Sequence, residues 1–146
     1  MNNMLHREDS PARIEYSKGI KRKEEWYVNG VRHREGQPAV ILYLESGMKY
    51  KEKWYLRGAM HREDGPALIE YDVSGRKIRE DWYKNGKHHR EDGPARTIYI
   101  NTPAGTSAEF SEYFIEDKWV SEEEFKKYTK IYKLLNQIPQ KKKIKL

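Results

Sequence analysis

The sequence predicts a mainly β fold: an elongated single-layer antiparallel sheet of repeated β-hairpins with a C-terminal capping α-helix. Three observations predict it. Aromatic residues and histidines recur every 28 residues, β-favouring residues alternate within each period, and Asn-Gly dipeptides separate the alternating stretches. Self-similarity at a period of roughly 20–50 residues is typical of repeat proteins, in which each unit is one supersecondary element.

The period is clearest in a Trp-Tyr pair. Trp26, Trp54 and Trp82 are 28 residues apart, and each is followed by a tyrosine. A His-Arg-Glu stretch keeps the same spacing, with a first interval shorter by one residue; its copies begin at His6, His33, His61 and His89. We therefore expect an array of about four hairpin repeats over residues 1–120, of which the fourth is degenerate.

Each unit contains two strands and a tight turn. Ala39, Ile41 and Tyr43 occupy alternate positions of the first strand, which is typical of a half-buried strand. The second strand is a charged run that ends in the Trp-Tyr pair. The turn that follows is Asn29-Gly30, Arg57-Gly58 or Asn85-Gly86. Asn-Gly favours two-residue hairpins because both central residues need positive φ.

The fourth unit departs from this pattern. Asn101–Ala108 predicts a lengthened turn, and Tyr113-Phe114 stand at the Trp-Tyr position. Ser121 and Glu124 then have the spacing of a capping box, which predicts a capping helix over residues 121–138. Apolar residues at helical spacing would cover the last hairpin: Phe125, Tyr128, Ile131, Tyr132, Leu135 and Ile138.

The charge lies mostly at the C-terminus. The net charge is +6, and from Ser121 onward there are eight Lys against three Glu, so five of these charges lie there. Residues 139–146 are expected to be a basic flexible tail with Lys141, Lys142, Lys143 and Lys145. The absence of cysteine excludes disulfides and thiolate metal sites. Without a signal peptide or an apolar run of ~20 residues, we expect a soluble, cytoplasmic protein.

The segment WYKNGKHHREDGPARTIY at Trp82–Tyr99, with its copies at Trp26–Tyr43 and Trp54–Tyr71, resembles MORN repeats, and more closely their longer variant. The resemblance covers roughly residues 5–120. It implies stacked hairpin units and roles in scaffolding, dimerisation and partner binding. The HREDGP stretch is also similar to arrays of large DNA viruses and phages, and some variant-repeat proteins are labelled toxin-neutralising. The family's Gly-x-Gly spacing is absent here, and Pro-Ala takes its place.

The recurring histidine, arginine and acid raise the question of acid–base or metal chemistry. If each unit adds two strands, equivalent residues lie ~9–10 Å apart along the sheet, whereas two ligands of one Zn²⁺ are only a few Å apart. His61 and Asp64 could still form an acid–base pair within one unit, as in a hydrolase, but four copies favour a polar network. In that network histidine would bond an acid or a carbonyl, and arginine would bridge to the next repeat. We expect no catalytic residue, no metal and no cofactor.

The aromatic columns indicate a core on one face and a binding surface on the other. The tryptophans are interpreted as core, and His88, the one histidine outside the repeat, as exposed and without a role. Tyrosine and arginine dominate binding hot spots, so the candidate protein-binding residues are Tyr27, Tyr55, Tyr83, Arg62 and Arg90.

These observations predict a non-enzymatic repeat scaffold that binds a protein of unknown identity through an exposed face or an edge strand. It could form a homo-oligomer through the N-terminal edge of the sheet. The partner could be a toxin, a defence protein or a virion component, and the site of action a host cell or a virion. The alternative is association with nucleic acid or an anionic membrane through the basic region Lys126–Lys145.

Overall fold

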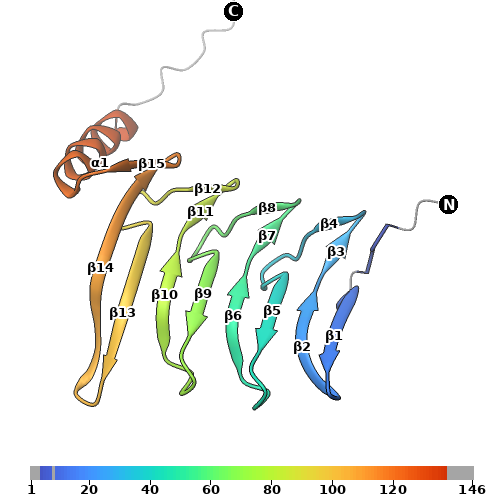
Figure 1. Cartoon of the computed structure of the whole chain (residues 1–146). Coiled ribbons are helices and arrows are strands. Elements are labelled where there is room, and N and C mark those ends of the chain that lie inside the picture. The colour runs from blue at the N-terminus through green and yellow to red at the C-terminus, as the bar shows by residue number, and fades with distance from the viewer. Residues whose placement is uncertain (1–3, 8, 138–146) are drawn as a thin grey trace, which may run out of the picture.

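A computed structural model describes residues 4–7 and 9–137 of the chain. Within these residues the protein is mainly β, with one antiparallel sheet of hairpins and a single C-terminal helix, which confirms the predicted fold class. Figure 1 shows the hairpins side by side in one open layer, running from the N-terminal end to the C-terminal end.

The main sheet has nine strands in the described part of the chain, in the order β1-β2-β5-β6-β9-β10-β13-β14-β15. Their bounds are β1 (Arg13–Ser17), β2 (Ile20–Glu25), β5 (Val40–Tyr43), β6 (Lys49–Lys53), β9 (Leu68–Tyr71), β10 (Lys77–Asp81), β13 (Arg96–Thr102), β14 (Gly105–Ile115) and β15 (Lys118–Val120). Three short hairpins stand above it: β3 (Tyr27–Val28) with β4 (Val31–Arg32), β7 (Tyr55–Leu56) with β8 (Ala59–Met60), and β11 (Tyr83–Lys84) with β12 (Lys87–His88).

Successive units join by strand pairing. The second strand of one unit pairs with the first strand of the next, as β2 with β5, β6 with β9 and β10 with β13. The register is the same each time, because Glu24 lies opposite Ile41 and Glu52 opposite Ile69. Since consecutive units pair strand to strand along one sheet, the array is a one-dimensional repeat structure.

The turns of the short hairpins have the backbone that the sequence predicts. Asn29 and Asn85 have φ of 49° and 50°, and the glycine after each also has positive φ. Arg57 has φ 49° at the same position, and the fourth unit uses Glu116 and Asp117 with φ of 53° and 67°. Asparagine tolerates this left-handed region better than other non-glycine residues. Arg57 in the second turn and Glu116-Asp117 in the fourth therefore keep the turn geometry at a cost in conformational free energy.

The apolar core is small and is formed where units meet. Trp26 is buried with Ala39 and Ile41 of the next unit, and Trp54 is buried in the same way with Ala67 and Ile69. Trp26 and Trp54 thus pack on the first strand of the following unit, as expected for the main apolar area of a thin sheet, whereas Trp82 is half-buried.

The fourth hairpin is longer than its sequence suggests. The expected lengthened turn over Asn101–Ala108 is wrong, because the pairing of β13 with β14 continues from Tyr99–Ala108 to Thr102–Gly105. Only Pro103 and Ala104 lie between the two strands. Extended backbone with free partners on both strands forms ladder hydrogen bonds in preference to a loop.

Helix α1 (Glu122–Gln137) begins at the predicted capping box. Glu124 N donates to Ser121 Oγ at 3.2 Å, and Ser121 N donates to Glu124 Oε2 at 2.8 Å. Phe125 is buried, and its ring centroid lies 4.8 Å from that of Tyr113 in β14. The first turn of α1 therefore anchors the helix to the last hairpin.

The rest of the helix covers less of the hairpin than expected. Ile131 and Leu134 are 58% and 55% exposed. The side chain of Leu135 lies outside the described residues, as do Ile138 and the predicted tail, Lys141, Lys142, Lys143 and Lys145.

Candidate functional site

The histidine of each His-Arg-Glu stretch joins two units. His61 Nδ1 accepts a hydrogen bond from the backbone N of Asn85, in the turn of the next unit, at 3.0 Å. A nitrogen that accepts carries no proton, so the His61 proton lies on Nε2, which is 2.9 Å from Glu63 Oε1. The same Nδ1 contact recurs as His6 with Asn29 at 3.2 Å, His33 with Arg57 at 3.0 Å and His89 with Glu116 at 3.3 Å. The histidine column is therefore a row of joints.

The arginine that follows each histidine covers a tryptophan. Arg62 Cζ lies 4.4 Å from the Trp54 ring centroid, while Arg62 Nε donates to Asp64 Oδ1 at 3.0 Å. The expected bridge from arginine to the next unit is formed by Arg62 Nη1, which donates to the Pro66 carbonyl at 3.5 Å, and by the Arg62 backbone N, which donates to the Tyr83 carbonyl at 3.4 Å. Arg90 repeats the arrangement over Trp82 at 3.9 Å, and Arg34 over Trp26 at 3.8 Å. Cation–π contacts of this kind stabilise by roughly 0.5–1 kcal/mol at exposed sites.

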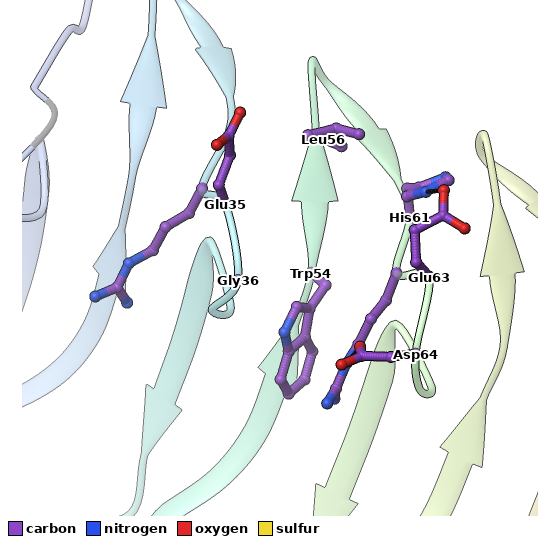
Figure 2. A pocket seen from close by; sticks show the side chains of 9 residues that line it. Glu35, Gly36, Trp54, Leu56, His61, Glu63 and Asp64 are labelled. Atoms are coloured by element: carbon purple, nitrogen blue, oxygen red, sulfur yellow. Dashed lines mark hydrogen bonds and ion pairs between the residues drawn. The ribbon is translucent and has the colours of Figure 1, made fainter.

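Shallow grooves lie between successive His-Arg-Glu loops. Figure 2 shows Trp54 between the Glu35–Gly36 segment on one side and His61, Glu63 and Asp64 on the other. The groove has a volume of about 290 Å³, below or at the lower limit of small-molecule sites, which span roughly 300–1,000 Å³. The equivalent grooves beside Trp26 and Trp82 have volumes of about 460 and 370 Å³, which lie at the lower end of that range. Among the described residues there is no group of three or more His, Asp or Glu side chains arranged to hold a metal ion.

A second set of contacts between successive units, which sequence reasoning missed, lies beside the clusters of Trp26 and Trp54. Tyr71 OH donates to Glu52 Oε2 at 2.8 Å, and Lys49 Nζ donates to Glu52 Oε1 at 2.7 Å. Burial, followed by the hydrogen bond to Glu80, raises the pKa of Tyr99 to about 12. The equivalent contacts in the other units are Tyr43 with Glu24 at 2.5 Å and Tyr99 with Glu80 at 2.6 Å. The signal was a Lys-x-x-Glu-x-Trp run at the same period.

We call the surface that carries Tyr27, Tyr55 and Tyr83 the tyrosine face; Tyr55 and Tyr83 also pack against the clusters of Trp26 and Trp54, so the expected separation from the core is incomplete. All three rings are half-buried. Arg32 Cζ lies 5.7 Å from the Tyr27 ring centroid and 5.6 Å from that of Tyr55. Arg62 and Arg90, expected beside the tyrosines, instead place their guanidinium groups over Trp54 and Trp82.

His88 also belongs to the tyrosine face, so its interpretation as an exposed residue without a role is wrong. It is half-buried, with ring centroids 4.0 Å from Tyr83 and 5.0 Å from Phe114. Its backbone N donates to Asp117 Oδ1 at 2.7 Å. Its packing between two aromatic rings joins the third unit to the degenerate fourth.

Two buried carboxylates lie beneath the tyrosines. Glu25 is 1% exposed and pairs with Arg32 at 2.8 Å and Lys23 at 3.1 Å. Asp81 is fully buried and pairs with Arg79 at 2.6 Å. Buried carboxylates need such partners, because an unpaired buried charge is strongly unfavourable.

The middle unit reverses the charge at this position. Lys53 stands where the neighbouring units carry Glu25 and Asp81. Burial and the charges of Lys51 and Arg32 lower the pKa of Lys53. No carboxylate in the described part of the chain forms an ion pair with Lys53. The Lys53 ammonium group on the tyrosine face is therefore half-buried without an ion-pair partner among the described residues.

No protein-family model matches this chain, and no curated protein and no solved structure matches it. No helix in the described residues is both long enough and apolar enough to cross a membrane.

Proposed function

We propose that this chain is a non-enzymatic repeat scaffold that mediates protein–protein interaction through its tyrosine face. One observation carries the proposal: the recurring side chains that could have formed reaction centres are already engaged, the histidines between successive units and the arginines over the tryptophans. The tyrosine face is the extended surface on which aromatic rings and an unpaired cation remain within reach of a partner.

The chemistry of this face suits a protein partner. Tyrosine offers a rigid apolar ring with a polar tip, which is why it is enriched in hot spots. The neighbouring units form ion pairs at this position within the chain. Lys53 has no such pair, and a carboxylate of the partner would provide one. We therefore expect a partner with an acidic side chain among apolar contacts.

We also propose which kind of protein this chain is and where it acts. The similarity of the HREDGP stretch at His61–Pro66 and His89–Pro94 to variant MORN repeats supports a MORN-like repeat protein encoded by a virus or phage. It would act in the cytoplasm of a host cell, with a toxin or a defence protein as its partner.

Affinity capture from the native source tests the proposal. The wild-type chain, a Tyr55→Ala variant and a Lys53→Glu variant are compared, with Lys18→Glu as the matched charge reversal at an exposed turn. The proposal expects a co-purifying protein that both tyrosine-face variants lose and the Lys18 variant retains. Equal capture by all four chains would contradict it.

The second candidate is association with nucleic acid or an anionic membrane through the basic C-terminal region. The observation that favours it is that five of the six net positive charges lie from Ser121 onward. Removal of the residues after Gln137, combined with a salt titration, tests it, since binding through lysines falls steeply with salt. Unchanged binding of the natural partner by the truncated chain would remove its support.

A further inference from the structure

The N-terminal edge of the sheet is open. Each later unit begins with a strand that is paired on both sides: β5, for example, pairs with β2 and with β6. Strand β1 pairs with β2 alone among the described residues, and Figure 1 shows it at the end of the sheet. Its outer row of backbone groups is available for another strand.

The side chains of β1 include the residue types that, in the later units, contact the preceding unit. Ile14 is 40% exposed, whereas Ile41 and Ile69 at the same position are each 7% exposed. Tyr16 is 63% exposed, although Tyr43 at its position is half-buried and bonds Glu24. The apolar and phenolic groups that every other unit covers are uncovered in β1.

The later units show which kind of strand pairs with this surface. In three places the covering strand is a Lys-x-x-Glu-x-Trp run, at residues 21–26, 49–54 and 77–82. Its glutamate lies opposite the isoleucine position, as Glu52 lies opposite Ile69. At the first two places its tryptophan packs on the alanine and isoleucine of the covered strand, and at the third the covered strand has Thr97 at the isoleucine position. The same register at β1 would place a glutamate opposite Ile14, within reach of the Tyr16 hydroxyl.

The charged side chains on the other side of β1 further restrict the sequence of a strand that could pair with it. Arg13 occupies the row of Arg96, which pairs with Asp81 at 3.2 Å from the strand opposite. Glu15 occupies the row of Glu70, which pairs with Lys51 of the opposite strand at 2.6 Å. An incoming strand therefore fits best with a cation opposite Glu15 and an acid opposite Arg13.

We infer that β1 is a docking edge for a protein partner that adds one antiparallel strand with the motif cation-Glu-acid-Trp. The partner's glutamate accepts from Tyr16, its tryptophan covers Ile14, its acid pairs with Arg13 and its cation pairs with Glu15. Strand addition of this kind takes affinity from backbone hydrogen bonds and specificity from alternate side chains. The inference deepens the proposed protein-binding function and rests on it only in requiring a protein partner.

The chain supplies its own probe. The peptide RKIREDWYK, residues 76–84, contains the motif as Arg79-Glu80-Asp81-Trp82. It is added, with blocked ends, to the isotope-labelled full chain up to about 1 mM, a concentration that detects weak strand binding. We expect saturable chemical-shift changes and slower amide exchange within Arg13–Ser17. Peptides with Trp82→Ala or Glu80→Gln should bind at least about tenfold more weakly.

Variants of the full chain locate the site. Ile14→Lys should abolish peptide binding, and because Ile14 is already exposed the fold should persist. Arg13→Asp should weaken binding of the native peptide, and a peptide with Asp81→Arg should restore it. Val73→Lys, at a position 78% exposed in the turn after β9, is the matched control and should bind normally.

Three results would overturn the inference: no binding of the native peptide at about 1 mM, equal binding of the Trp82→Ala peptide, or shifts confined to strands other than β1. These outcomes are separate from failure of the proposed function. Loss of peptide binding leaves partner capture through Tyr55 and Lys53 untouched. Conversely, equal capture by the tyrosine-face variants leaves the peptide result at β1 unchanged.

Discussion

Replacing His61 with alanine should destabilise the array by an amount that the contacts of its ring allow us to work out. The bond from Asn85 N to Nδ1 is 3.0 Å long, and a net hydrogen bond contributes roughly 0.5–1.5 kcal/mol. The bond to Glu63 adds little, since that carboxylate is 80% exposed. The ring is 8% exposed, so its loss also leaves a void. We expect a loss of about 1–3 kcal/mol, or roughly 3–10 °C in Tm.

Thermal unfolding and amide exchange test this expectation together. His61→Phe is the matched control, because phenylalanine fills the space but offers no acceptor to the Asn85 amide. The Asn85 amide should exchange faster in both variants, while His61→Ala should lose more stability than His61→Phe. Unchanged Tm and unchanged Asn85 exchange, together with loss of a catalytic turnover, would refute the reasoning and revive a hydrolase.

Three further predictions concern a turn, a buried acid and the cap. Arg57→Asn should raise the free energy of unfolding in urea by about 0.5–1 kcal/mol, because asparagine tolerates positive φ. Burial raises the pKa of Glu25, but hydrogen bonds from Arg32 and Lys23 outweigh it and hold the pKa below 4.5. The stability Glu25 contributes is thus present above pH 4.5 and lost as pH falls through the lowered pKa, so Glu25→Gln should flatten the acid limb of a stability profile. Phe125→Ala should cost about 3–5 kcal/mol and speed amide exchange in the first turn of α1.

The period, the turns and the cap could be predicted because each has a local cause. Asn29-Gly30 and Asn85-Gly86 select a two-residue turn through their own backbone preferences, and the structure gives them positive φ. Ser121 and Glu124 form the capping box through neighbouring atoms alone. For these turns and this cap the cause lies within a few residues, and the sequence was sufficient.

The contacts across strands could not be predicted, because they depend on register. Tyr43 meets Glu24 from 19 positions away, and a bulge between Leu42 and Tyr43 shifts the pairing there. A slip of one residue would turn these side chains to the other face. The place of Arg62 over Trp54 was missed for a similar reason, since it depends on the fold of the loop around Gly65.

Gly65 illustrates that dependence. A Cβ there would lie 2.7 Å from Arg62 Cζ, so the missing side chain makes room for the guanidinium group. Gly65 is not among the positive-φ residues, so a left-handed turn does not explain the glycine there. The glycine serves close packing, which periodicity alone does not reveal.

The most direct test of the account is the protonation of the imidazole nitrogens of His33, His61 and His89, measured by long-range nitrogen–proton NMR correlation at pH 8. If these histidines join successive units, each ring carries its proton on Nε2, and Nδ1 accepts from the backbone amide of Arg57, Asn85 or Glu116. Protons on Nδ1, or rings that exchange freely between both forms, would show that the recurring histidines are available for chemistry and are not joints.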